Sequence, residues 1–295
     1  MGDGERRGFR SVKARGAHSR LRTPTTTPTR LQRRRIIRER RSKVLMQLAA
    51  IAFFLLVWEL VTVTQLVGIP TPVTTFQTFA SLIVTPEPVL GRTLLEHARA
   101  SLTRVIESAL IAFAVAIPLG IAIGWSKRFD YFASTLIEIF RPIPPLALIP
   151  LVFALFMTYG NTVLLAQLFI VALAVFLPTV VTVVEGVKAI DPTIVDAART
   201  LGARTHQLLT KVVLYASIPA IFAGVRIGLG IGWASIVAAE LIGGSGTGLG
   251  YFIMTMYEVG GRMPEIISGI IMIGIIGFLM NEGILWIQHR VIRWA

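Results

Sequence analysis

The sequence predicts an all-α polytopic membrane protein with six transmembrane helices. Two features of the composition support this class: 54% of the 295 residues are hydrophobic and only 15% are charged. A soluble domain carries about 25% charged residues. The apolar residues also gather in separate windows of about 20 residues, which as helices are long enough to cross a hydrocarbon core of about 30 Å. A soluble globular enzyme is therefore excluded.

Six windows of this kind occur, and each is predicted to form one span. They lie at residues 44–64, 101–124, 133–157, 162–184, 216–240 and 266–288. The third has the least defined boundaries, because Arg141 and three prolines between residues 142 and 145 interrupt its first half. It could instead begin as an interfacial helix, since proline breaks a helix. Glycines spaced four apart in the second and fifth windows predict close helix packing.

The net charge of +13 is concentrated in the first 43 residues, which carry 15 Lys and Arg against three acidic residues. We expect residues 1–43 to form a disordered cytoplasmic arm whose basic end fixes the orientation of the first span. Nucleic-acid binding is not expected, because Phe9 is the only aromatic residue of the arm. A cleavable signal peptide is not expected either, because the apolar run begins only at Val44.

With the arm in the cytoplasm, the predicted inner loops are rich in basic residues and the positive-inside rule is obeyed. Both termini are then cytoplasmic. The chain divides into the arm, a first span with its outer segment at 44–96, a transmembrane domain at 97–288 and a C-terminal end at 289–295. The transmembrane domain contains a long inner loop at 185–215. The chain has no cysteine and only four scattered histidines, so no metal site is expected.

The long inner loop predicts a short helix displayed outside the membrane. Asp191 can accept hydrogen bonds from free backbone N–H groups, and Pro192 suits the first helical position. The helix is expected to run to about Leu201, where Gly202 can adopt the left-handed conformation that ends it. Thr205 is then expected to cap a second helix that enters the membrane. An amphipathic loop lying on the lipid surface remains the alternative from the residues alone.

The segment DAARTLG in this loop, followed by Ser217, Ile218 and Pro219, resembles the EAA loop of ABC importer permeases. The resemblance implies that the short helix is a coupling helix, which docks into a groove on a cytoplasmic ABC ATPase dimer. The residues implied in coupling are Asp196, Ala197, Ala198, Leu201, Gly202 and Pro219. Asp196 stands where the pattern has glutamate, so the charge is kept on a shorter side chain.

Three further segments narrow the resemblance: SLTRV at 101–105, RPIPPLALIPL at 141–151 and the glycine-rich stretch at 223–251. Together they are similar to permeases of the nitrate, sulfonate and taurine importers, most of all to taurine permeases, over about residues 45–290. This implies a type I importer with a MetI-like core, in which two permease copies, an ATPase dimer and an extracytoplasmic solute-binding protein assemble in the inner membrane of a bacterium or archaeon.

The resemblance implies that the chain carries a small anionic or zwitterionic solute, such as taurine, another sulfonate, nitrate or bicarbonate, by alternating access. The chain lacks a G-x-x-x-x-G-K-[ST] loop, so ATP and Mg²⁺ are expected on the partner ATPase, and no enzyme activity or bound cofactor is expected here. The alternative is a self-sufficient channel or secondary transporter that uses Glu107 and Glu282 as ion sites. No inverted repeat is visible to support it.

Charged residues within the spans are candidates for the translocation path, because each costs about 3 kcal/mol at the membrane centre and usually faces the bundle interior. The candidates are Arg226, Glu107, Glu240 and Glu282. Arg226 lies deepest, about 15 Å from the inner end of its span at 1.5 Å per residue. It could form a structural ion pair with Glu107 or Glu282, snorkel to the interface, or attract an anionic solute.

Residues 243–246 spell G-x-S-G, an arrangement also found around the serine of rhomboid-type intramembrane proteases. That chemistry needs a histidine base within hydrogen-bond reach of Ser245. None of the four histidines lies inside a predicted span near the outer face, and His97 comes closest. We therefore expect a flexible outer glycine turn after Glu240.

Overall fold

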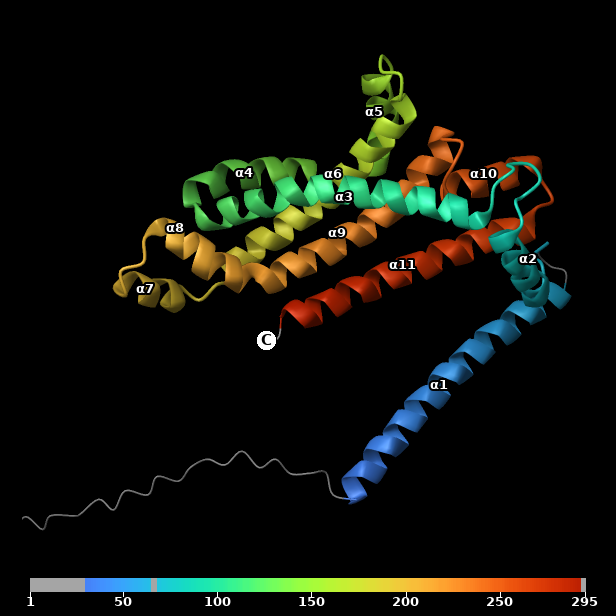
Figure 1. Ribbon diagram of the computed structural model, residues 1–295, viewed down its shortest axis with the longest axis horizontal. Coiled ribbons are helices and arrows are strands. Elements are labelled where there is room, and N and C mark those ends of the chain that lie inside the picture. The colour runs from blue at the N-terminus through green and yellow to red at the C-terminus, as the bar shows by residue number, and fades with distance from the viewer. Residues whose placement is uncertain (1–29, 65–67, 293–295) are drawn as a thin grey trace, which may run out of the picture. The chain divides into compact units, whose positions relative to one another are not determined.

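A computed structural model describes residues 30–64 and 68–292 of the chain (Figure 1). All the regular elements of these residues are helices, joined by one isolated bridge between Glu87 and Arg92. The described residues divide into two units, one that ends at Val57 and one that begins at Trp58, and each is described separately. The all-helical class predicted from the composition is confirmed.

Helix α1 (Arg30–Val63) begins in the first unit and is 34 residues long. Its apolar part, Leu45–Val63, is long enough to cross a membrane, as predicted for the first window. The helix begins earlier than expected, so the basic stretch 30–43 is helical rather than disordered. Arginine, glutamine and leucine favour helices, and a helix that is already formed extends easily into such a sequence. The rest of the predicted arm, residues 1–29, lies outside the described residues.

Four long helices form the body of the second unit: α3 (Leu94–Trp125), α6 (Thr162–Lys188), α9 (Leu214–Gly243) and α11 (Met263–Val291). Each is long and apolar enough to cross a membrane, α9 together with the turns that precede it. The second, fourth, fifth and sixth predicted windows each fall within one of these helices. Helix α6 packs along both α3 and α9 (Figure 1), and this packing forms the core that positions the loops at either end.

Glycines allow the close packing of α6 against its two neighbours. A Cβ atom on Gly120 of α3 would lie 2.8 Å from the Cβ of Val183 on α6. From the other side, a Cβ atom on Gly228 of α9 would lie 2.5 Å from Thr179 Oγ1. Both separations are too short for a real side chain, so glycine is required where the backbones approach. The packing predicted from the glycine spacing is confirmed.

The third predicted window is two helices rather than one straight span. Helix α4 (Lys127–Phe140) is followed by the 3₁₀ turn η1 (Pro145–Leu148) and helix α5 (Ile149–Phe156), with a bend of 77° between the two parts. The prolines at 142, 144 and 145 cannot donate backbone hydrogen bonds, which ends α4 at Phe140. The described residues therefore hold five candidate spans, or six when the bent pair is counted as one.

Two shorter helices lie outside the predicted spans, one in the outer segment after the first span and one after the predicted outer glycine turn. Helix α2 (Pro72–Val84) begins with the side chain of Thr71 accepting a hydrogen bond from the backbone N–H of Thr74, at 3.1 Å. Helix α10 (Leu249–Val259) lies between α9 and α11, and its Phe252 and Met256 are completely buried. We call the end of the second unit that carries α10 the α10 end, and the opposite end, which carries the loop between α6 and α9, the α7 end.

Candidate functional site

The loop between α6 and α9 contains helix α7 (Pro192–Thr200), which begins as the sequence predicts. The carboxylate of Asp191 accepts a hydrogen bond from the backbone N–H of Thr193 at 2.8 Å, and Pro192 occupies the first helical position. Hydrogen bonds from the hydroxyl and backbone of Thr193 lower the pKa of Asp191 below its ordinary value. The cap therefore stays charged at neutral pH and fixes the start of the helix.

The C-terminal end of α7 is fixed equally well, by a Schellman motif. Gly202 has φ +85°, a left-handed conformation that a side chain would strain. Its N–H donates to the carbonyl of Arg199 at 2.9 Å, and the N–H of Ala203 donates to the carbonyl of Ala198 at 3.1 Å. Two of the residues implied in coupling, Ala198 and Gly202, thus take part in ending the helix.

The outer surface of α7 is exposed and partly apolar. Leu201 is 89% exposed and Ile194 is 52% exposed. Asp196 and Ala197 are also exposed, whereas Ala198 is half-buried. Asp196 pairs with Arg199 at 3.3 Å, but an exposed pair of this kind contributes little to stability. A short helix with both ends fixed and a leucine in solvent is suited to bind another protein surface.

The second helix of the loop begins differently from the prediction. Thr205 does not cap it but is its first residue: α8 (Thr205–Gln207) follows Arg204, whose backbone N–H donates to Gln207 Oε1 at 2.8 Å. The chain continues through a π-helical turn, η2 (Leu208–Val213), directly into α9. Gln207 closes the first turn from within the helix, so a hydroxyl cap is not needed. Pro219 lies inside α9, beyond this turn.

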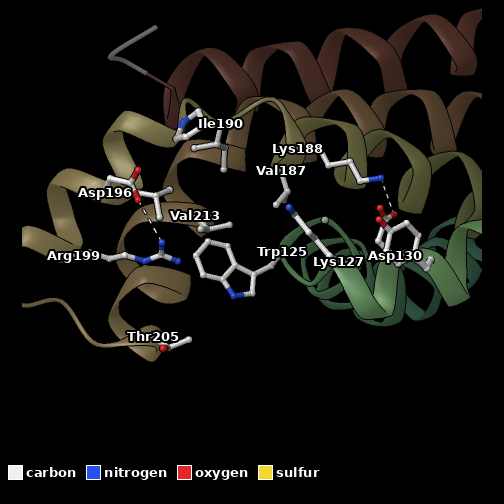
Figure 2. Close-up of a pocket in the computed structure, with 14 residues that line it drawn as sticks. Trp125, Lys127, Asp130, Val187, Lys188, Ile190, Asp196, Arg199, Thr205 and Val213 are labelled. Atoms are coloured by element: carbon white, nitrogen blue, oxygen red, sulfur yellow. Dashed lines mark hydrogen bonds and ion pairs between the residues drawn. The ribbon is translucent and has the colours of Figure 1, made fainter.

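A cavity of about 680 Å³ lies between α7 and the adjacent ends of α3, α4 and α6 (Figure 2). Two ion pairs stand on its walls: Lys188 Nζ to Asp130 Oδ1 at 2.7 Å, and the Arg199–Asp196 pair of α7. Trp125 and Lys127 also line it. Because Lys188 belongs to α6 and Asp130 to α4, the first pair ties the bent span to the helix that leads into α7. The mixture of charges and an aromatic ring is suited to contacts with protein side chains.

At the α10 end, the carboxylate of Glu240 is completely buried and fully occupied by protein donors. Ser101 Oγ donates to its two oxygens at 2.9 and 2.8 Å, and Arg104 Nη1 donates at 2.8 Å. The backbone N–H of Gly250 donates at 3.1 Å. Arg104 also binds the carbonyl and hydroxyl of Thr247, at 2.8 and 2.6 Å. This Glu240 cluster joins α3, α9 and the turn that leads into α10.

The glycine-rich turn at residues 244–248 is built around the same cluster. Gly248 has φ +120°, and a Cβ atom there would collide with the carboxylate of Glu240. The backbone N–H of Gly248 donates to His97 Nδ1 at 3.1 Å. Ser245 donates to the carbonyl of Thr247 at 2.6 Å. The serine and the nearest histidine therefore have separate partners, and the G-x-S-G arrangement serves as a structural turn.

The other charged candidates are placed on exposed surfaces. Arg226 donates from Nε to Asn281 Oδ1 at 2.9 Å. Glu107 and Glu282 are exposed, and within residues 30–64 and 68–292 neither forms an ion pair with Arg226. Of the three alternatives for Arg226, the ion pair is not formed within the described residues, where the amide of Asn281 on α11 is its partner instead. Arg104, which sequence reasoning did not single out, lies in the SLTRV segment that carried part of the resemblance.

These features define a class: a polytopic helical membrane protein that displays a short, rigidly capped helix between two of its spans. Residues 116–294 match the family described as binding-protein-dependent transport system inner membrane component. The chain belongs to this family of ABC importer permeases.

Relatives are consistent with this family over most of the chain. The taurine transport system permease protein of Escherichia coli is 34% identical over 255 residues, which cover 85% of this chain and 90% of that protein. The bicarbonate transport system permease protein of Synechococcus elongatus is 30% identical over 261 residues, 87% of this chain and 92% of that one. The solved MetNI methionine ABC transporter, in inward-facing conformations, has a chain with a similar fold, with a TM-score of 0.57 at 19% identity over 68% of this chain and 94% of that chain.

Proposed function

We propose that the chain is the permease subunit of an ATP-driven importer that moves a small anionic or zwitterionic solute across the cytoplasmic membrane by alternating access. The observation that carries the proposal is α7, a helix fixed at both ends with Leu201 89% exposed. The named solutes of two relatives, taurine and bicarbonate, are both small and carry an oxyanion. Related sulfonates and nitrate belong to the same chemical range.

In this proposal α7 docks on a separate cytoplasmic ATPase that binds ATP and Mg²⁺. Asp196, Ala197 and Leu201 form the docking surface, and the capped ends keep the helix rigid so that movement of the ATPase reaches the spans. The π-helical turn and Pro219 carry that movement into α9. The α10 end then faces outward and receives the solute-binding protein, and a second copy of the chain completes the path.

Two of the charged candidates within the spans have different roles under this proposal. The side chain of Glu240 is completely buried and cannot contact a solute. We therefore assign Glu240 a structural role at the α10 end rather than a place on the translocation path. Arg226 is different, because its positive charge has an amide partner rather than a carboxylate. An uncompensated charge within a span favours a position facing the path. Arg226→Leu is then expected to abolish uptake while the complex still assembles, and unchanged uptake would contradict this role.

The docking role of α7 is tested by substitutions at Gly202. Gly202→Val places a branched side chain at φ +85° and strains the cap by about 1 kcal/mol or more, whereas asparagine tolerates this conformation. We expect Gly202→Val to lose co-purification of the ATPase and ATP-dependent uptake, and Gly202→Asn to retain both. Gly91→Val is the matched control, because Gly91 has φ +65°, open space around it and a place far from α7 in the sequence.

The assay reconstitutes the permease with its ATPase and binding protein in proteoliposomes and measures uptake of labelled taurine, with and without internal ATP. Uptake that needs ATP and the binding protein supports the importer. If uptake proceeds without either, the chain acts alone as a channel or secondary transporter, and the ion-site hypothesis for Glu107 and Glu282 takes its place. Equal loss of ATPase binding in Gly202→Val and Gly91→Val would contradict a specific role of α7.

A further inference from the structure

A second cavity, of about 410 Å³, lies between the bend that follows α4, one wall of α6 and one wall of α9. Its size is within the range of sites for small ligands. Apolar side chains such as Ile227 and Ile231 of α9 line part of it, and three polar side chains, Arg141, Thr182 and Glu185, line the rest. None of the charged candidates identified from the sequence lies on its walls.

The cavity holds one positive and one negative side chain that do not neutralise each other. Within the described part of the chain, neither Arg141 nor Glu185 has an ion-pair partner. Both side chains line the cavity and are exposed in the single chain. Charges close to apolar spans are expensive unless they face water or a polar ligand. A ligand that carries both an anionic and a cationic group would satisfy the pair together.

The helical hydrogen bonding of the backbone is also interrupted on two sides of the cavity. On one wall, the bent span leaves helical geometry after Phe140. On the other, Pro178 lies inside α6 and has no N–H, so the carbonyl of Ala174 lacks its usual helical partner. Both Ala174 and Pro178 line the cavity. Irregular backbone at membrane depth is tolerated where it lines a cavity, and interrupted helices mark substrate sites in transporters.

The cavity extends along α6 from Ala174 to Glu185. The 11 residue steps between these two positions correspond to about 16 Å at 1.5 Å per residue. It therefore runs from near the middle of α6 toward the α7 end. The hydroxyl of Thr182 donates to the carbonyl of Pro178 at 2.8 Å, which leaves its oxygen lone pairs available to a cationic group. The cavity thus offers a cationic side chain, an anionic side chain and a hydroxyl acceptor on walls that are otherwise apolar.

We propose that this cavity is a solute site on the α7 side of the translocation path, and that it takes a short zwitterion of the aminosulfonate type. Arg141 binds the sulfonate oxygens through its guanidinium group, and Glu185 binds the ammonium group. The inference rests on the proposed importer function, and it adds the class of solute and the two side chains that recognise it. A simple anion such as bicarbonate would leave Glu185 without a partner.

The site can be tested without transport, because the chain has no cysteine of its own. Thr182→Cys places a single thiol on the cavity wall, and the reconstituted permease is labelled with two methanethiosulfonate reagents, one bearing a sulfonate and one a trimethylammonium group. We expect both reagents to react. Adding Arg141→Gln should lower the reaction rate of the sulfonate reagent by about tenfold, which corresponds to the loss of one charged hydrogen bond. The reaction rate of the cationic reagent should not change. Glu185→Gln should give the opposite result.

Two controls separate local from general effects. Arg128→Gln removes the same charge from α4 at a residue that does not line this cavity, and it should leave both rates unchanged. Leu136→Cys places a thiol in a different, apolar cavity and should react poorly with either charged reagent. The proposal is overturned if Thr182→Cys is unreactive, or if Arg141→Gln and Arg128→Gln change the two rates equally.

Uptake then distinguishes failure of this inference from failure of the importer function. In the full complex, Arg141→Gln should lower taurine uptake by about tenfold or more, while ATP hydrolysis stimulated by the binding protein is retained. If the unaltered complex shows no ATP-dependent uptake, the importer function itself fails. If the unaltered complex imports taurine and Arg141→Gln matches it, only the role of this cavity is excluded.

Discussion

At the scale of single residues, the structure distinguishes charged side chains that are paired within the fold from charged side chains that have no ion-pair partner in the described residues. Glu240 accepts hydrogen bonds from Ser101, Arg104 and Gly250 and is completely buried. Arg141 and Glu185 face a cavity without ion-pair partners in the described residues. In the sequence all of these residues look alike, as single charges in or beside apolar windows. Their roles follow from partners that lie far along the chain, which spacing does not reveal.

Glu240→Gln is expected to destabilise the α10 end. The substitution removes the negative charge opposite the guanidinium of Arg104 and leaves a largely buried cation without its partner. Breaking a buried pair costs about 3–5 kcal/mol, and the slight exposure of Arg104 favours the lower part of that range. The measurement is the midpoint of thermal unfolding of the purified chain in detergent. Glu107→Gln is the control, since Glu107 is exposed. If Glu240→Gln unfolds like the control but fails to support uptake, Glu240 belongs to the path after all.

At the scale of elements, the sequence predicts helix boundaries that are set by residues close to them in the chain. The start and end of α7 follow from Asp191, Pro192 and Gly202, and each acts within a few residues of itself. The bend after Phe140 was recognised as an interruption but not as a break of 77°. Helix α10 was missed, because it is too short to span the membrane and its start is set by Glu240 cluster contacts rather than by a capping side chain.

Packing between elements gives a prediction with an internal control. Gly228 and Gly230 are two residues apart on α9 but have different surroundings. A Cβ atom on Gly228 would lie too close to Thr179 of α6, whereas a Cβ atom on Gly230 would have nothing within 4 Å. We expect Gly228→Leu to separate α6 from α9 and lower stability by about 1–3 kcal/mol or more. Gly230→Leu should be tolerated. Thermal unfolding of both variants in detergent tests this, and equal midpoints would contradict the packing.

At the scale of the whole molecule, hydropathy alone predicts where the spans lie but not how the two ends differ. The α7 end presents a short exposed helix, whereas the α10 end contains the buried Glu240 cluster and further ion pairs. Arg262 there contacts Glu265 at 2.8 Å and Glu87 at 3.4 Å, and the hydrogen bond that its guanidinium donates to Glu265 raises the pKa of Arg262. The basic residues Lys127, Lys188 and Arg199 gather at the α7 end, which favours the cytoplasmic side for that end.

We expect this asymmetry to set the orientation of the chain in the membrane, which can be measured with single cysteines. Leu201 of the α7 end is 89% exposed and Tyr257 of α10 is 69% exposed. A membrane-impermeant maleimide should label Tyr257→Cys in intact cells and Leu201→Cys only in inverted vesicles. In those vesicles, the bound ATPase should protect Leu201→Cys, and stripping the ATPase should restore labelling, because the leucine lies on the proposed docking surface. Labelling of Leu201→Cys from outside intact cells would reverse the topology and remove the basis for ATPase docking at α7.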